Sequence, residues 1–414
     1  MNQLLQTSGD AIIAGYGKLA LVIVQRKDGK GVSVYQLSAS NASSSLENDV
    51  QSLALKEISQ SNYLCAVCRK DKTMDIYNIN MDPEEESECE THITLAPILT
   101  HKTNKRCSSI EFSTIKSNNN SENETHIIVA GDLVGDVTAY PTTTSAPEGT
   151  SRLLLGHTVS ILTSIKIVNG RIFSADRDEK IRVSSFPHTF HTEGYLLGHE
   201  AYITDIAISI DGLLCVSVSG DYTMKLWDCV TFKEIQSIDL CTNIDDEDAF
   251  TGLPVKVSMN KEGIIAVIYD DEDVIDIFDK TLTKIQRIQL SATPLALSFD
   301  EHGHLIVLLN GYVYITSFEM TSERLFQMID SNPFSEEINK ICMTVDGLSI
   351  PKTVLEKDEN GRNSLMKVVA EEKGDNQEMP WNRVERIEKQ KERARRRKRR
   401  KLEEALAEQK ATVE

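Results

Sequence analysis

Two segments of this chain repeat each other at a spacing of 42 residues. Gly156-His157 stands in LLLGHTVSILTSI and Gly198-His199 in YLLGHEAYITDIA, and a second matching segment follows each pair about twenty residues later. These second segments are SADRDEKIRVSSF and SVSGDYTMKLWDC, and the latter contains Trp227-Asp228. A repeat of this length cannot bury a core alone, so stacked copies must supply one, and this requirement constrains the fold more than any other feature of the chain.

The Gly-His and Trp-Asp pairs, separated as they are here, are typical of WD repeats, each of which forms one four-stranded blade of a β-propeller. The closing strand of a blade presents alternate side chains to opposite faces, so it reads as aliphatic, any residue, small or aliphatic, then aromatic or hydroxyl. We find seven matches and predict an all-β, seven-bladed WD40 propeller over residues 1–350. The matches are VSVY (32–35), MDIY (74–77), VTAY (137–140), IRVS (181–184), MKLW (224–227), IDIF (275–278) and VYIT (313–316).

Polar sequence interrupts and follows the predicted propeller. The insertion at 82–124 contains MDPEEESECE and KSNNNSENET, which have no apolar period, so we interpret it as an excursion from the blade loops and leave its role open. Residues 351–380, with EKDENGRN and EEKGDNQ, predict a solvated polar linker. Residues 381–414 are rich in Glu, Lys, Arg, Ala and Leu and contain no Gly or Pro, which predicts a basic helical tail.

The charge of the chain is divided unequally between body and tail. The net charge is −18, but residues 381–401 contain twelve Lys or Arg against three Glu, so this segment carries +9 and the remainder −27. This density of positive charge favours contact with an RNA backbone or a nuclear import receptor, with a solvated helix end as the alternative. The predicted RNA or import contacts are Arg393, Arg395, Arg396, Arg397, Lys398, Arg399, Arg400 and Lys401.

The sequence indicates neither an active site nor a metal site. It contains no nucleophile elbow, P-loop or HExxH motif, and Cys65 and Cys68 lack the second cysteine pair of a zinc site. Gly15, Gly17 and Ala20 formally fit a dinucleotide fingerprint, but no helix pattern follows them. No apolar run of 18 residues, signal peptide or paired cysteine framework occurs. We therefore expect a soluble intracellular protein without catalytic residues, small-molecule substrate or membrane contact.

A hydrogen-bonded chain of side chains is expected within each blade. In WD blades a His after the Gly, an Asp in a tight turn, a strand hydroxyl and the closing Trp can connect the outer strands to the turn, and buried histidines normally have such partners. We therefore assign the matching residues a structural role rather than a catalytic one. They are His199, Asp221 and Trp227, with Ser217 or Ser219 as the hydroxyl, and, in the preceding repeat, His157 and Asp178.

The segment ADRDEKIRVS carries six charges in seven consecutive positions, from Asp176 to Arg182. It places Asp176, Arg177, Glu179 and Lys180 where the next repeat has Ser, Gly, Tyr and Thr, whereas turn chemistry asks only for small or polar residues. Such a turn is either a solvated loop, in which exposed ion pairs contribute about 0–1 kcal/mol, or a docking surface whose alternating charges fix the register of a partner. The residues alone leave both interpretations open.

Four of the quoted segments together resemble a known family. LLLGHTVSILTSI, SADRDEKIRVS, LLGHEAYITDIAIS and SGDYTMKLWD, within about residues 125–230, look like the WD-repeat non-catalytic subunit of the eukaryotic tRNA (guanine-N7)-methyltransferase, the Wuho-type family. In that family an inert propeller forms a heterodimer with a Rossmann-type methyltransferase that binds S-adenosylmethionine and forms N7-methylguanine in the tRNA variable loop. The resemblance implies no cofactor in this chain. It also implies tRNA contact through the basic tail, since an acidic propeller repels phosphate.

The resemblance also implies which residues bind the catalytic subunit, and among them we expect Glu179 and Arg182 to contribute most. Asp178 would belong to the blade as well and pair with Arg182. A general WD-repeat scaffold, acting as a substrate receptor or a translational-repression adaptor, is the alternative function. We expect a nuclear protein, with the cytoplasm as a second location. The implied contacts are Asp176, Arg177, Asp178, Glu179, Lys180 and Arg182.

Overall fold

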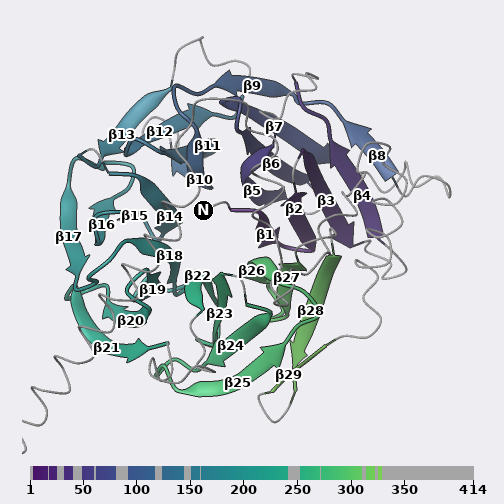
Figure 1. Ribbon diagram of the computed structural model, residues 1–414. Helices are drawn as coiled ribbons and strands as arrows, with labels where there is room; N and C mark the ends of the chain where they lie inside the picture. The colour runs from purple at the N-terminus through teal and green to yellow at the C-terminus, as the bar shows by residue number, and fades with distance from the viewer. Residues whose placement is uncertain are drawn as a thin grey trace, which may run out of the picture. The chain divides into compact units, whose positions relative to one another are not determined.

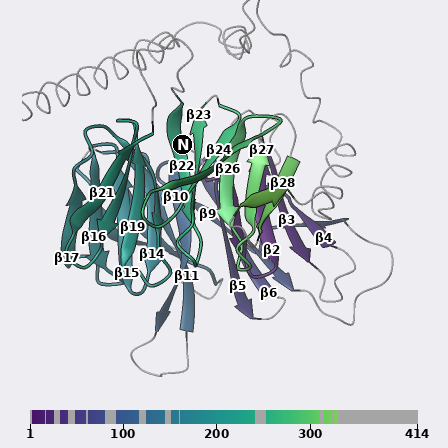
Figure 2. The ribbon, with the colours of Figure 1, turned by 90° about the horizontal axis from the view of Figure 1, so that it is seen from below.

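Seven β-sheets stand around a central axis in the computed structural model (Figure 1). Each sheet is one blade, numbered 1 to 7 in chain order, and a view from the side shows the strands upright beside one another (Figure 2). The seven predicted closing strands lie in seven different sheets, which confirms the all-β propeller and its number of blades. The structure describes residues 3–16, 18–25, 32–40, 49–59, 62–80, 92–116, 124–143, 151–158, 160–240, 252–270, 272–309, 314–321 and 325–328.

Each blade is ordered from an inner strand at the axis to an outer strand at the rim. Blades 1 to 3 consist of β1 (Leu5–Ser8), β2 (Ala11–Tyr16), β3 (Leu19–Gln25), β4 (Val32–Leu37) and β8 (His92–Leu95); β5 (Val50–Ser59), β6 (Asn62–Arg69), β7 (Thr73–Asn80) and β9 (Leu99–Lys102); and β10 (Cys107–Lys116), β11 (Glu124–Asp132), β12 (Asp136–Pro141) and β13 (Arg152–Gly156). Blades 4 and 5 consist of β14 (Leu162–Val168), β15 (Arg171–Asp176), β16 (Lys180–Ser185) and β17 (Thr192–Leu197); and β18 (Ile203–Ile208), β19 (Leu214–Ser219), β20 (Thr223–Asp228) and β21 (Lys233–Asp239). Blades 6 and 7 consist of β22 (Leu253–Met259), β23 (Ile265–Asp270), β24 (Val274–Phe278) and β25 (Lys284–Gln289); and β26 (Pro294–Phe299), β27 (Leu305–Leu309), β28 (Tyr314–Met320) and β29 (Phe326–Met328).

The middle strands lie between neighbouring blades and are apolar on both faces, as strands covered on two sides must be. All five residues of β27, LIVLL, are buried, whereas the outer strand β21, KEIQSID, is mostly exposed. Between blades 4 and 5, Phe173 and Ile181 pack in one buried cluster with Cys215 and Trp227. Because packed interiors are stiff, this shared cluster gives the turns above it a rigid base.

The N-terminal strands build blade 1 and leave blade 7 to the C-terminal part of the ring. Residues 11–14 lie in β2, and β1 pairs antiparallel with β2, so blade 7 borrows no N-terminal strand. The two blades meet through a hydrogen bond from Thr7 Oγ1 to the carbonyl of Phe299 at 2.7 Å. With β1 at the axis, VSVY falls in the fourth strand, β4, whereas the other six matches fall in the third strand of their blades.

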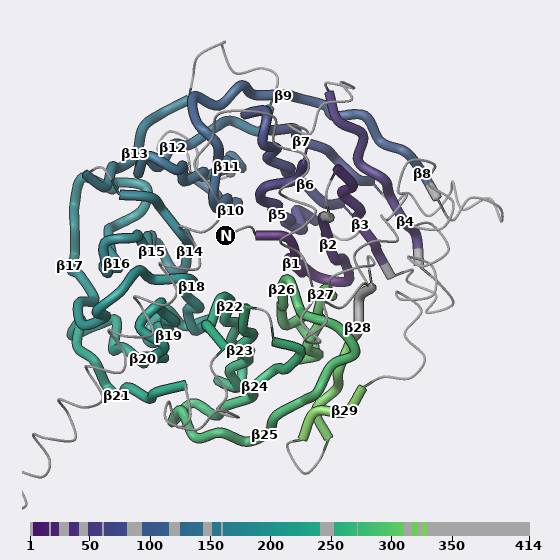
Figure 3. Tube along the Cα trace, in the orientation of Figure 1, coloured from purple at the N-terminus to yellow at the C-terminus, as the bar shows by residue number. Residues whose placement is uncertain are grey.

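One strand of the insertion at 82–124 returns to the preceding blade. β8 pairs in parallel with β4, with Val34 opposite His92, before the chain continues into β9, the outer strand of blade 2 (Figure 3). Residues 81–91 and 117–123 of the insertion lie outside the described residues, as do the linker 351–380 and the tail 381–414 with its eight predicted RNA or import contacts. Within the described residues no helix is long and apolar enough to cross a membrane.

Candidate partner-docking site

The charged segment forms the turn between β15 and β16 of blade 4. Its side chains separate into two groups, because Arg177, Asp178, Glu179 and Lys180 are exposed whereas Asp176 is buried. Glu179 has a φ of 71°, in the left-handed region that non-glycine residues enter at a cost. Four consecutive charged side chains thus project from one tight turn.

Asp176 holds this turn from below. Its Oδ1 accepts hydrogen bonds from the amides of Asp178 (2.8 Å) and Lys180 (3.2 Å), and its Oδ2 lies 2.8 Å from His157 Nδ1. His157 Nε2 lies 2.8 Å from Ser174 Oγ. The prediction that Asp178 is the turn partner of His157 is therefore wrong. Asp176 ends β15 with its side chain directed inward and takes that role, while Asp178 lies on the exposed part of the turn.

Arg182 is half-buried and is held by its own blade. Its Nε donates to Ser184 Oγ at 3.0 Å, and its Nη2 donates to the carbonyl of Thr189 at 3.2 Å. A third donor, Nη1, lies 3.4 Å from the carbonyl of Gly156. The predicted Arg182–Asp178 pair is absent from the ion pairs of the described residues, because the guanidinium points along the blade instead of toward the turn. Arg182 thus supports the site more than it projects from it.

Glu179 lies in an acidic environment. Partial burial raises the pKa of its carboxyl, and the charges of Asp221, Asp178 and Glu200 raise it further, while Lys180 opposes them. None of the described basic residues forms an ion pair with it within 4 Å. A cation from outside the chain would relieve this repulsion, so Glu179 is well prepared to accept one.

Blade 5 shows the same architecture with different turn chemistry. His199 Nδ1 lies 3.0 Å from Asp221 Oδ2, and its Nε2 lies 2.7 Å from Ser217 Oγ, which also accepts from Trp227 Nε1 at 2.8 Å. The hydroxyl that connects His199 to Trp227 is thus that of Ser217 and not that of Ser219. Burial alone would raise the pKa of Asp221, but hydrogen bonds, from His199 above all, hold it well below its usual range. These residues stabilise the blade.

Two apolar side chains beside the turn are missing from the sequence-based prediction. Leu197 and Tyr195 lie on β17, directly across from Lys180 and Arg182, and are 60% and 44% exposed. Exposed apolar side chains next to charged ones are typical of a protein interface. The signal in the sequence is weak, because a Tyr-Leu-Leu run before Gly198-His199 could equally be buried on both faces.

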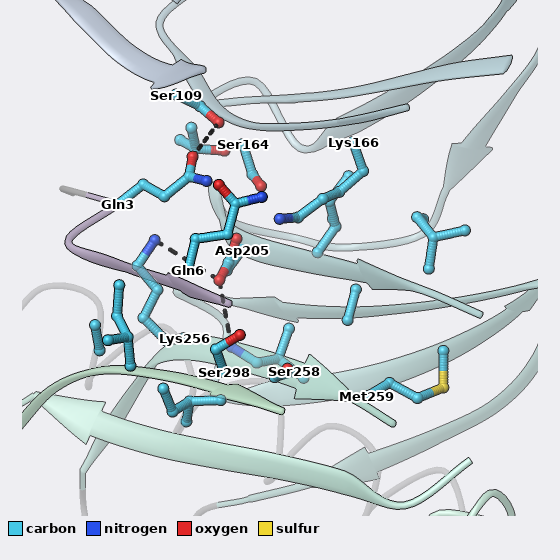
Figure 4. Close-up of a pocket in the computed structure, with 18 of the residues that line it drawn as sticks. Gln3, Gln6, Ser109, Ser164, Lys166, Asp205, Lys256, Ser258, Met259 and Ser298 are labelled. Carbon is cyan, nitrogen blue, oxygen red and sulfur yellow. Dashed lines mark hydrogen bonds and ion pairs between the residues drawn. The ribbon is translucent and has the colours of Figure 1, made fainter. Parts of the chain in front are cut away.

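A pocket at the axis offers no evident alternative site. It lies among the inner strands (Figure 4), where Lys256 Nζ is 3.6 Å from Asp205 Oδ2 and Lys166 Nζ is 3.7 Å from Glu111 Oε2. The first ion pair joins blades 6 and 5 and the second joins blades 4 and 3, so these charges hold neighbouring blades together. No three His, Cys, Asp or Glu side chains among the described residues gather closely enough to hold a metal ion.

Comparisons with known proteins place this geometry in context. Residues 17–344 match a family described as the tRNA methyltransferase TRM82 WD40 domain. Relatives named as tRNA (guanine-N(7)-)-methyltransferase non-catalytic subunits are similar to parts of the chain. Wuho of Drosophila willistoni is 37% identical over 115 residues (27% of this chain, 26% of the relative), and wdr4 of Xenopus laevis is 32% identical over 218 (49% and 52%). Wuho of Aedes aegypti is 28% identical over 274 residues (63% and 62%).

The chain thus spans between 26% and 62% of the length of these relatives. Among solved structures, the WD40 propeller domain of Doa1 has a TM-score of 0.54 at 13% identity and covers 78% of this chain and 95% of its own. The propeller domain of Cps50 (Swd1) from Myceliophteria thermophila has a TM-score of 0.55 at 10% identity and covers 77% and 96%. At these identities the structures support the fold alone.

Proposed function

Because the chain belongs to the family of the tRNA methyltransferase TRM82 WD40 domain, we propose that it is the non-catalytic subunit of a tRNA (guanine-N7)-methyltransferase. It forms a heterodimer with a Rossmann-type catalytic subunit, which supplies the S-adenosylmethionine site and methylates a guanine in the tRNA variable loop. The exposed turn of blade 4 is the docking site. The propeller itself contributes no cofactor and no reacting group.

One observation carries the docking proposal. Arg177, Asp178, Glu179 and Lys180 are exposed on a turn whose backbone is hydrogen-bonded from below by the buried Asp176. A rigid turn that carries both signs of charge loses little conformational entropy on binding and fixes the register of a partner with complementary charges. The repulsion that raises the pKa of Glu179 is relieved when the partner supplies a cation.

A subunit without catalytic groups can still raise activity. It does so when it binds the active conformation of the enzyme more tightly than the inactive one, which shifts the population by the difference in affinity. A seven-bladed ring with shared cores between blades is stiff enough to hold a partner in one conformation. Assembly of the complex in the nucleus, directed by the basic tail, remains part of this proposal.

The test is co-purification of the full chain with the catalytic subunit, together with an assay of N7-methylation of tRNA. A Glu179→Lys, Lys180→Glu double variant preserves net charge and exchanges the charges of the last two residues of the turn. We expect it to lose at least about tenfold in affinity for the catalytic subunit, since mispaired charges at a desolvated interface cost several kcal/mol. The matched control is Glu262→Lys, Lys280→Glu, which exchanges two exposed charges on loops of blade 6.

The outcomes separate the possible functions. Loss of binding and methylation in the turn variant alone supports the docking site. Full binding by a folded turn variant would show that the turn is a solvated loop. Failure of the wild-type chain to bind would favour the general WD-repeat scaffold.

A further inference from the structure

A basic surface lies across blades 1 and 2, on a chain whose net charge is −18. Its six cationic side chains come from three short segments: the β2–β3 turn, the β6–β7 turn, and the β9–β10 loop that leads into blade 3. Five of them are exposed and Lys70 is partly exposed. We call this surface the basic ridge. It consists of Lys18, Lys70, Lys72, Lys102, Lys105 and Arg106.

The basic ridge lies on the same face of the ring as the docking turn. In every blade the four strands nearest the axis follow one another outward in antiparallel steps, so the turns between second and third strands share one face. The β2–β3, β6–β7 and β15–β16 turns are of this kind in blades 1, 2 and 4. The loop from an outer strand to the next inner strand, such as β9–β10, opens on that face too.

Hydrogen bonds to main-chain carbonyls, one from an amide and two from arginine side chains, fix the three segments to one another. The amide of Thr103 donates to the carbonyl of Lys72 at 2.8 Å, and Arg106 Nε donates to the carbonyl of Lys70 at 3.0 Å. Arg69, which is buried, donates from Nη1 to the carbonyl of Lys18 at 3.0 Å. The cations are therefore presented by a connected backbone rather than by independent loops.

The carboxylates close to the ridge are largely occupied by the backbone. Asp71 Oδ1 accepts from the amide of Thr73 at 3.0 Å and from its hydroxyl at 2.6 Å. Asp132 Oδ1 accepts from three amides of its own turn. Asp49 is the exception, because its Oδ2 lies 2.8 Å from Lys70 Nζ. Asp71 and Asp132 are thus held in their own turns, and neither forms an ion pair with Lys72, Lys102 or Lys105.

Lys72, Lys102 and Lys105 form no ion pair within 4 Å with a carboxylate of the described residues. Solubility does not require such a cluster on an acidic protein, and mutual repulsion among the lysines makes it unfavourable in the free chain. The corresponding turn of blade 6 carries the opposite sign, with Asp270, Glu272 and Asp273. The face is therefore positive on one side and negative on another, a pattern that orients a polyanion.

We propose that the basic ridge binds the phosphate backbone of the RNA substrate beside the docked catalytic subunit. The proposal rests on the proposed function, because that function supplies a tRNA to this face. Lys72, Lys102 and Lys105, which form no ion pair with a described carboxylate, contact phosphates as point charges and position an RNA without reading its sequence. The propeller is then not uniformly repulsive to RNA, and the basic tail is not this chain's sole RNA contact.

The test is tRNA binding by the heterodimer that contains Lys72→Gln, Lys102→Gln, Lys105→Gln. These substitutions keep the carbonyls of Lys72 and Lys105 that fix the loop. We expect at least about tenfold weaker binding and a salt slope that is smaller by about three, one per lost phosphate contact. The matched control is Lys233→Gln, Lys261→Gln, Lys280→Gln, which removes the same charge from blades 5 and 6.

Several outcomes would overturn the ridge proposal without touching the docking site. Unchanged affinity and salt slope in the ridge variant, or an equal loss in the control, would show that the ridge does not contact RNA. Loss of the heterodimer itself would show that the ridge belongs to the protein interface. If the wild-type chain fails to bind a methyltransferase, the proposed function fails, and binding of tRNA to the chain alone still reports on the ridge.

Discussion

Blades 4 and 5 share a hydrogen-bonded His, Ser and Asp but differ in the exposure of the turn between their second and third strands. Both place a His between a strand Ser and a buried Asp, with distances of 2.7 to 3.0 Å. Blade 5 completes the chain with Trp227 and buries its turn residue Tyr222, whereas blade 4 has Ser184 in place of the Trp and exposes Glu179. Both turn residues have positive φ, 64° and 71°.

The difference shows how the turn of one repeat comes to expose its side chains to solvent. In blade 5 the ring of Tyr222 is buried, so this turn residue packs against the protein instead of projecting into solvent. In blade 4 the partner of the His is Asp176, two positions before the residue that matches Asp221 of blade 5. The four side chains that follow Asp176 are exposed. Strain in such a turn tends to persist where the surroundings hold it and function uses it.

The largest expected loss of stability comes from a substitution that breaks the hydrogen bonds of His199 and Trp227 in blade 5. Ser217→Ala removes the oxygen that bonds both His199 Nε2 and Trp227 Nε1, which leaves two buried polar groups unsatisfied. We expect a loss of about 2–4 kcal/mol in the free energy of unfolding. Ser174→Ala in blade 4 removes the partner of His157 Nε2 and a long hydrogen bond of 3.5 Å to the carbonyl of Arg182, and should cost about 1–2 kcal/mol. Urea denaturation of both variants measures the difference, and equal losses would contradict it.

A second, smaller effect separates architecture from contact within blade 4. Asp176→Asn keeps one oxygen for the two backbone amides that bond Oδ1, but it places an NH2 group where Oδ2 now meets His157 Nδ1, and it should cost about 1–3 kcal/mol. Asp178→Asn should change stability by less than about 0.5 kcal/mol, since its side chain is exposed. Binding to the catalytic subunit reverses the order in variants that stay folded, with Asp178→Asn the weaker binder. A stable Asp176→Asn would return the scaffold role to Asp178.

The fold was largely predictable, because one strand in each blade carries the same short pattern of aliphatic residues followed by an aromatic or hydroxyl residue. Seven matches gave seven blades. The order within blade 1 was not predictable, because β1, LQTS, has one buried residue and no apolar period. Its presence at the axis moves VSVY to the fourth position. The return of β8 to β4 was also hidden, since a parallel pairing between distant segments leaves no local pattern.

The candidate site was predictable in position but not in detail. An excess of charge in a tight turn is visible in the sequence, whereas the direction of each side chain depends on the register of the turn against His157. This is why Asp178 received the role that Asp176 performs. The basic ridge was missed because its main parts, RKDK at 69–72 and KTNKR at 102–106, are short and about thirty residues apart. Only the pairing of β9 with β7 brings them together.

The smallest expected effect is a difference in titration between the two turns. Asp221 of blade 5 has a pKa well below its usual range and stays ionised in mildly acid solution, whereas Glu179 of blade 4 has a raised pKa. For the free chain, the sign follows from linkage. A raised carboxyl pKa lowers stability as pH rises from the ordinary value to the raised one, so ionised Glu179 is a small cost.

Docking reverses that sign, because a cation from the partner lowers the pKa of Glu179 in the complex. Affinity for the catalytic subunit should therefore be highest above the free-state pKa and fall as pH drops through it, by up to about tenfold per unit until the bound-state pKa is reached. Glu179→Gln should bind more weakly at neutral pH and lose this component of the pH profile, while Lys180→Gln should retain it. Affinity measured by titration calorimetry from pH 5 to 7.5 distinguishes the variants. A wild-type profile identical to that of Glu179→Gln would mean that Glu179 meets no cation, and the docking contact would then rest on Arg177, Asp178 and Lys180.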